Sequence, residues 1–249
     1  MRIRFRTVKD LGIVPLHGVM LVTCHLPWLR RFLFWLAGLA GKAMYAVPGT
    51  YLRRGLRNYC AVVGRTDYRR VYMELVDKSI VAGNAFGELI RGKVDKLAAM
   101  SAMDPHCAST IARLQEQYGG AVVVLPHCPG ALLSAIRFGV DCSAALLVRD
   151  SRREFRGRVN RHYFDRLGPA VIYVNRGEGG LLGATREILR TLKAGTFLLG
   201  TTDRPWKDRP DMIQVEAFGQ PVWLPQWPAK FSAKTGLPIL PGFMHMQPN

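Results

Sequence analysis

The chain has 249 residues, 49% of them hydrophobic, and its 35 Lys and Arg against 18 Asp and Glu give a formal net charge of +17. This length and apolar content suffice for one large core, and the charge favours anionic partners such as lipid headgroups, phosphorylated substrates or acidic carrier proteins. Nucleic acid is disfavoured as a partner, because the sequence has no helix-turn-helix signature or aromatic RNA-binding motif. Five widely spaced cysteines argue against a disulfide framework and a structural zinc site, and they indicate a reducing compartment.

The N-terminal region is apolar behind a short basic lead. Residues 11–29 contain no Asp, Glu, Lys or Arg, and residues 32–47 contain only Lys42. The first stretch just reaches the length of a membrane-spanning helix. Trp28 and Trp35 suit the boundary between lipid headgroups and hydrocarbon.

We therefore predict a membrane anchor over residues 11–47, which is either a single span or an interfacial pair of helices. The alternative is an ordinary buried helical hairpin. With this anchor the chain divides into two parts. Residues 1–50 hold the basic lead and the anchor, and residues 51–249 hold an α/β domain.

Helices and strands are predicted to alternate through the rest of the chain. Apolar spacing predicts a long amphipathic helix over residues 66–91, and Asp104-Pro105 begins a helix that continues to about Tyr118. Strands are predicted over 121–125, 144–148, 170–174, 196–199, 213–218 and 237–243, and further helices over 131–138, 181–193 and 227–234. This alternation predicts a single α/β domain with a central, mostly parallel sheet flanked by helices. Its active edge lies at the carboxyl ends of the strands.

The strongest functional signal lies between Gly119 and Gly139. Residues 121–125 are an aliphatic run typical of a strand buried on both faces, and His127 follows in a Pro-His-Cys-Pro-Gly turn before the next helix. A histidine at the carboxyl end of a buried strand is well placed to act as a general base. The alternative is a turn histidine held by hydrogen bonds.

Charged residues also follow the other predicted strands: Arg149 with Asp150, then Arg176, then Asp203. Because parallel strands end at one edge of the sheet, we expect these residues to share a crevice with His127. A base, a carboxylate and an arginine for an anion suit the transfer of an acyl group to a hydroxyl. The alternatives are a turn role for Asp203 and a structural ion pair for Arg176.

A run of arginines lies between residues 149 and 161, relieved only by Asp150 and Glu154. One interpretation is a docking surface for lipid phosphates or for an acidic carrier protein. The other is the solvated face of a helix.

The order and spacing of these features resemble the glycerolipid and lysophospholipid acyltransferase superfamily, and its late lipid A acyltransferase branch fits best. Four family motifs have counterparts in the same order. The histidine of His-x4-Asp/Glu aligns with His127, and a looser form of Gly-x-x-[Phe/Ile]-x-Arg stands at residues 168–176. A helix-ending Gly stands eight positions before an acid at Gly195 and Asp203, and residues 237–241 resemble the apolar strand containing Pro. The resemblance runs from about residue 10 to the C-terminus.

The resemblance implies direct acyl transfer at the cytoplasmic face of a bacterial inner membrane. His127 would deprotonate the hydroxyl of an anionic lipid acceptor, either a lipid A precursor or a lysophospholipid-like molecule. That hydroxyl would attack the thioester of an acyl-carrier protein or acyl-CoA. Asp203 and Asp150 are the expected carboxylate partners, and the expected substrate-binding residues are Arg176, Arg149, Gly130 and Cys128. No metal or bound cofactor is expected.

One position departs from the family pattern. The acid of the first motif should stand at position 132, where this chain has Leu132, which cannot orient an imidazole or stabilise an imidazolium. Asp150 and Asp203 are the candidate replacements, because both follow strands. The second hypothesis is therefore a catalytically silent relative that binds anionic lipid. A further alternative is a covalent route in which the thiol of Cys128 accepts the acyl chain.

Overall fold

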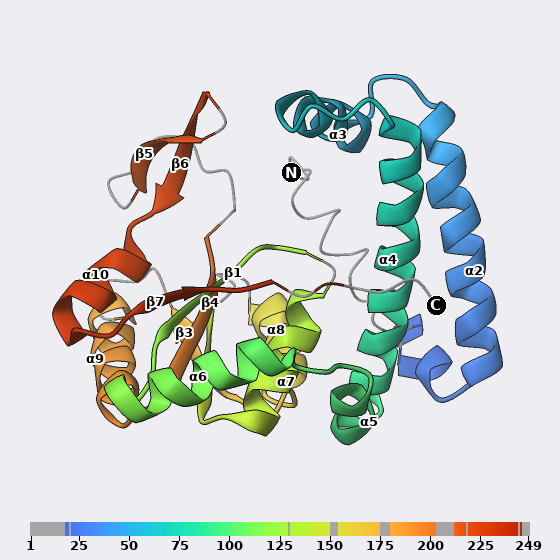
Figure 1. The fold of residues 1–249 in the computed structure, drawn as a ribbon. Helices are drawn as coiled ribbons and strands as arrows, with labels where there is room; N and C mark the ends of the chain where they lie inside the picture. Colours follow the sequence, from blue (N-terminus) through green and yellow to red (C-terminus); the bar gives the residue numbers. More distant parts are fainter. Residues whose placement is uncertain are drawn as a thin grey trace, which may run out of the picture. The chain divides into compact units, whose positions relative to one another are not determined.

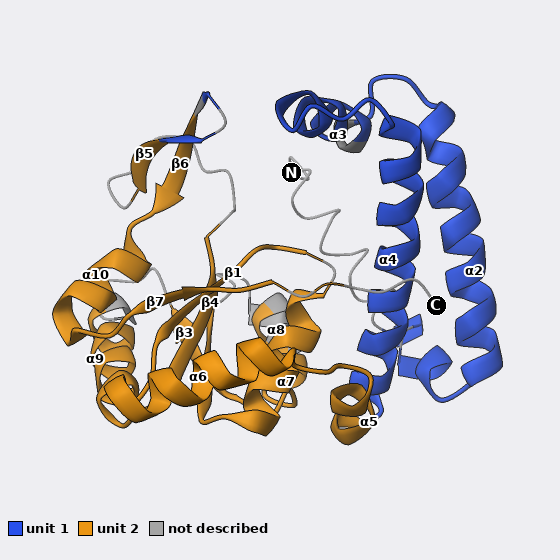
Figure 2. Cartoon of the chain, in the orientation of Figure 1, with its two compact units in different colours: residues 1–91, 216–220 blue, residues 92–215, 221–249 orange. Residues whose placement is uncertain are grey.

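The computed structural model describes residues 18–19, 21–128, 130–149, 154–174, 180–202, 212–217, 219–243 and 245. The chain forms two compact units, shown in separate colours in Figure 2. Unit 1 comprises residues 1–91 and 216–220, and unit 2 comprises residues 92–215 and 221–249. The expected boundary at residue 50 falls inside unit 1.

Unit 1 is built mainly from helices (Figure 1): α2 (Pro27–Ala43), the 3-10 helix η1 (Met44–Ala46), α3 (Tyr51–Val62) and α4 (Tyr68–Ile90). Helices α2 and α4 approach closely because glycines lie between them. A Cβ added to Gly83 of α4 would overlap the ring of Phe34 on α2. The hydroxyl of Tyr72 on α4 also donates a 2.9 Å hydrogen bond to the carbonyl of Gly41 on α2. Side-chain packing and this bond hold the two helices as a pair.

The predicted single membrane span is not supported. None of the helices that the structure describes combines the length and the apolar character needed to cross a bilayer. Residues 21–24 are helical, His25 lies in a turn and α2 begins at Pro27, so the apolar stretch breaks before it reaches residue 29. Proline lacks an N–H and favours the first position of a helix, which explains the break. Residues 11–17 and 20 lie outside the described residues.

Unit 2 contains a five-stranded sheet in the order β3-β2-β4-β1-β7. Every pairing in this sheet is parallel. The strands are β1 (Val122–Leu125), β2 (Ala144–Arg149), β3 (Ala170–Val174), β4 (Phe197–Thr201) and β7 (Ile239–Pro241). The predicted α/β class with a central parallel sheet is therefore confirmed.

Helices cover both faces of this sheet. The helices of unit 2 are α5 (Val94–Ala99), α6 (Pro105–Tyr118), α7 (Ala131–Asp141), α8 (Glu154–Phe164), α9 (Gly180–Lys193) and α10 (Trp227–Thr235). Val123 and Leu199 pack on one face with residues of α6 and α7. Val122 and Leu198 pack on the other face with residues of α9 and α10. The alternation along β1 and β4 is the two-residue period of a strand buried on both sides.

The predicted helix boundaries in unit 2 have visible causes. The side chain of Asp104 accepts a 2.9 Å hydrogen bond from the N–H of His106 at the start of α6. Gly119 ends the same helix in the left-handed conformation, with φ of 76°.

The strand predicted at 213–218 forms as β5 (Met212–Ala217), but it pairs with β6 (Gln220–Pro225) in a separate two-stranded sheet.

Candidate active site

His127 lies two residues beyond β1, at the carboxyl edge of the sheet, and its side chain is exposed. Leu125 and Thr201, the last residues of β1 and β4, are partners in the parallel register. This register brings Nε2 of His127 to 3.5 Å from Oγ1 of Thr201. The imidazole is thus open to an incoming molecule, as a general base requires.

A tight turn fixes the backbone on either side of His127. The N–H of Cys128 donates to the carbonyl of Pro126 at 2.9 Å, and the N–H of Ala131 donates to the carbonyl of Cys128 at 3.0 Å. Gly130 precedes α7 and has no side chain to cap it. The N-terminal end of a helix carries a partial positive charge and favours anions. The turn therefore places His127 next to a helix end suited to an oxyanion.

The other predicted site residues lie at or just after the ends of β2, β3 and β4, and the strand order brings these ends to one edge of the sheet. Strand β4 lies between β1 and β2, so Arg149, the last residue of β2, is two strands from β1. At ordinary strand spacing this is about 10 Å. Arg149 is exposed and pairs in register with Val174, the last residue of β3. All these strands end at one edge, as predicted.

Three predicted site residues, Asp150, Arg176 and Asp203, lie outside the described residues. Leu132 is half-buried and is the second residue of α7. The hydroxyl of Thr201 can orient the imidazole by a hydrogen bond, but it carries no charge to stabilise an imidazolium. The carboxylate partner of His127 therefore remains a prediction. Sequence reasoning did not single out Thr201, because a hydroxyl at a strand end is common and has no distinctive spacing.

Part of the predicted arginine run forms helix α8. The guanidinium of Arg161 lies over the ring of Tyr173 at 5.1 Å, and the hydroxyl of Tyr173 donates to Asp165 at 2.7 Å. Arg158 and Arg161 are exposed. Local packing explains the position of Arg161, so this part of the run fits a helix face that packs against the edge strand β3.

Within the part of the chain that is described, no three His, Cys, Asp or Glu residues lie close enough together to form a metal site.

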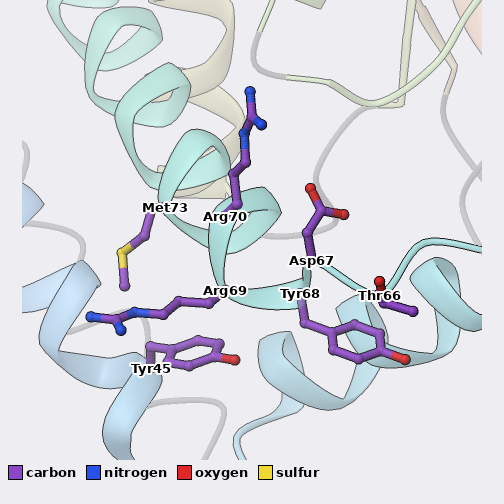
Figure 3. A pocket seen from close by; sticks show the side chains of 7 residues that line it. All are labelled: Tyr45, Thr66, Asp67, Tyr68, Arg69, Arg70 and Met73. Atoms are coloured by element: carbon purple, nitrogen blue, oxygen red, sulfur yellow. The ribbon is translucent and has the colours of Figure 1, made fainter.

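Unit 1 has an open pocket of about 520 Å³ at the N-terminal end of α4 (Figure 3), lined by Tyr45, Thr66, Asp67, Tyr68, Arg69, Arg70 and Met73. The guanidinium of Arg65 holds both oxygens of Asp67, at 2.9 and 2.6 Å, and lowers the pKa of that carboxyl. Arg70 pairs with Glu74 at 3.0 Å. The charges on Asp67 and Arg70 are thus matched by neighbours, and none of the seven lining residues is a histidine or a cysteine.

Unit 1 also buries an ion pair between Arg30 of α2 and Glu88 of α4. Arg91 adds a second contact to Glu88 at 3.3 Å. Cys24 is buried beside them, and burial raises the pKa of its thiol while Arg30 partly offsets the shift. Nε and Nη1 of Arg30 are buried and have no hydrogen-bond partner among the residues that the structure describes. The cluster is a polar core that joins the two helices.

The exposed imidazole and the helix end beside it form an arrangement in unit 2 that is suited to acid–base chemistry. The acyltransferase resemblance rests on the motifs in the sequence. No protein-family model matches this chain, and no curated protein matches it.

Proposed function

We propose that the protein transfers a fatty acyl chain from an acyl-carrier protein or acyl-CoA to a hydroxyl of a lipid acceptor. The observation that carries the proposal is the exposed ring of His127, held between the end of β4 and the start of α7. Acyl transfer to an alcohol needs a base for the hydroxyl and donors for the oxyanion. The turn after β1 offers both within a few residues.

In the proposed reaction, the imidazole of His127 removes the proton from the acceptor hydroxyl as its oxygen attacks the thioester carbonyl. The negative charge on the tetrahedral carbonyl oxygen is stabilised by backbone N–H groups at the start of α7. When the intermediate collapses, the carbon–sulfur bond breaks and the thiolate takes the proton from the imidazolium. The products are an acylated lipid and a free thiol, and the proposed reaction uses no external oxidant and no metal.

The acceptor is proposed to be an anionic lipid at the cytoplasmic face of a bacterial inner membrane, either a lipid A precursor or a lysophospholipid-like molecule. Arg149 stands at the same sheet edge as His127, and Arg176 is the arginine of the second motif. A guanidinium binds phosphate oxygens in pairs, which suits a phosphorylated headgroup. The net charge of +17 favours the same class of acceptor.

A second candidate function is lipid binding without catalysis. The observation that favours it is Leu132, which stands at the position of the motif acid. Without a carboxylate, the imidazole loses the group that fixes its tautomer and stabilises its charged form. In that case the protein would bind anionic lipid at the same sheet edge but would not catalyse acyl transfer.

The test is an acyl-transfer assay with purified protein in detergent micelles. Both donors are offered with a lysophospholipid and with a lipid A precursor, and products are identified by mass spectrometry. Transfer that disappears in His127→Ala supports the acyltransferase. Binding of the acceptor without transfer in any combination supports the silent relative. Equal turnover in wild type and His127→Ala excludes the base role of His127.

A further inference from the structure

The outer face of α2 is a continuous apolar surface. Trp28, Phe32, Trp35, Leu36 and Leu39 are each between 41% and 68% exposed. Their spacing places them on one side of the helix, because residues three and four apart share a face. The rings of Phe32 and Trp35 stack with their centroids 6.0 Å apart. Scattered exposed apolar residues are ordinary, but a contiguous patch of this kind marks an interaction surface.

The opposite side of α2 already has a partner. Arg30 and Gly38 are buried, and Gly38 lies against the side chain of Ile80 on α4. Packing on α4 therefore does not explain the outer face. Its two tryptophans are the residues that membrane interfaces enrich, because their rings are apolar with one polar edge.

The segment of sequence that contains this face carries charge of one sign. Residues 11–66 contain no Asp or Glu, but they contain seven basic residues: Arg30, Arg31, Lys42, Arg53, Arg54, Arg57 and Arg65. Arg30 and Arg65 are held by Glu88 and Asp67, and Lys42 pairs with Asp77 at 2.7 Å. Arg54 and Arg57 are exposed on α3. Arg31 is exposed on α2 itself. A unit that combines an apolar helix face with exposed arginines is complementary to anionic headgroups over hydrocarbon.

We propose that unit 1 binds anionic bilayers through the outer face of α2, with α2 lying in the plane of the interface and the arginines of α3 contacting lipid phosphates. This inference rests on the membrane association in the proposed function and assigns its surface and lipid chemistry. The 17 residues of α2 are about 25 Å long, shorter than the roughly 30 Å of the hydrocarbon core, which favours the in-plane orientation. A second copy of the chain is a poorer occupant, because pairing two α2 faces would bring like charges together.

The apolar contribution is tested with the variant Trp28→Gln/Trp35→Gln. Its matched control is Val140→Gln/Leu182→Gln, which replaces two exposed apolar side chains of unit 2. Sedimentation with vesicles of equal parts phosphatidylglycerol and phosphatidylcholine measures binding, and circular dichroism checks the fold. We expect at least about tenfold weaker binding for the tryptophan variant and wild-type binding for the control, because each exposed indole offers a large apolar area to the interface.

The charge contribution is tested with Arg54→Gln/Arg57→Gln against the control Arg186→Gln/Arg190→Gln, whose arginines are exposed on α9 in unit 2. An arginine near an anionic surface strengthens binding about fivefold. We therefore expect about 25-fold weaker binding to the anionic vesicles for the α3 variant and a much smaller loss for the control. On pure phosphatidylcholine the two variants should bind alike.

Three results would overturn the inference. Wild-type protein that does not bind anionic vesicles excludes it, and so does a tryptophan variant that binds like its control. A dimer that forms without lipid and dissociates in the tryptophan variant, with no vesicle binding, assigns the face to a second copy instead. Measuring vesicle binding and acyl transfer separately, with His127→Ala as the variant without the base, distinguishes a failure of this inference from a failure of the proposed reaction. Vesicle binding without any acyl transfer contradicts the proposed reaction alone, whereas transfer in micelles without vesicle binding contradicts the docking surface alone.

Discussion

The imidazole of His127 and the hydroxyl of Thr201 lie 3.5 Å apart, Nε2 to Oγ1, where β1 and β4 end side by side. A contact of this length between groups that follow adjacent parallel strands depends on the register of the sheet. We infer that Thr201 has a positioning role in the proposed reaction, because its hydroxyl constrains the ring of His127.

We predict that Thr201→Val lowers kcat about tenfold and leaves the acceptor KM nearly unchanged, since one modest hydrogen bond is lost. Thr201→Ser keeps the hydroxyl and should retain most of the activity. By comparison, His127→Ala should cost about 100- to 10,000-fold, the usual contribution of a general base. Steady-state kinetics on all three variants provides the measurement. Identical rates in Thr201→Val and wild type would contradict the positioning role.

Leu132 gives the sharpest test of the missing motif acid. We predict that Leu132→Asp raises kcat by at least about tenfold, because a carboxylate at this position can orient the imidazole and stabilise its charged form. An acidic residue is also favoured in the first turn of a helix, so α7 should tolerate it. Leu132→Asn is the control of equal size without charge. Equal rates in the two variants would show that His127 gains nothing from a carboxylate here.

Unit 2 was predictable because its strands and helix ends are encoded locally. A short aliphatic run predicts a strand buried on both faces, and Val122 and Val123 indeed join opposite cores. Asp104 and Gly119 bound α6 by a cap and a left-handed turn, which depend only on neighbouring residues. The parallel order then fixes the edge where His127 must lie.

The arrangement of unit 1 was harder to predict because it depends on distant pairs. The apolar stretches over 11–29 and 32–47 show that this region needs an apolar environment, but they do not show that one side of α2 packs on α4. Arg30 falls between the two stretches, and only the fold brings it to Glu88, which is 58 positions away. A single sequence contains no signal that pairs two such residues. The carboxylate partner predicted for His127 stays a prediction for another reason, because Asp150 and Asp203 lie outside the described residues.

Removing one partner of the buried pair of Arg30 and Glu88 should destabilise the protein strongly, whereas replacing both partners should destabilise it little. We predict that Glu88→Leu alone lowers the free energy of unfolding by about 3–5 kcal/mol, because it leaves the buried Arg30 without its carboxylate. Arg30→Met alone should cost less, because Glu88 keeps its 3.3 Å contact to Arg91. The double variant should recover most of this loss, since two apolar side chains fill the same space without desolvated charges. Urea denaturation of the four proteins gives the coupling energy. Additive losses would contradict the pairing.

Cys24 provides a pH-dependent probe of unit 1. Burial raises the pKa of its thiol above the ordinary value of 9.0. The neutral thiol is thus favoured in the folded state, and its contribution to stability is complete below about pH 9 and is lost as pH rises through the folded-state pKa. Because the thiolate is the reactive form, we predict that iodoacetamide labels the exposed Cys107 quickly at neutral pH and labels Cys24 only when unit 1 opens.

Mass spectrometry of peptides after timed labelling measures both rates in one sample. Denaturant below the global unfolding midpoint should accelerate the labelling of Cys24 and of the buried Cys60 of unit 1 together, and should leave the rate of the half-buried Cys142 of unit 2 nearly unchanged, if unit 1 opens separately. The variant Glu88→Leu should have the same effect without denaturant, since it removes the charge that holds Arg30 beside Cys24. Labelling of Cys24 as fast as Cys107 in the native protein would show that the thiol is not buried between the helices of unit 1.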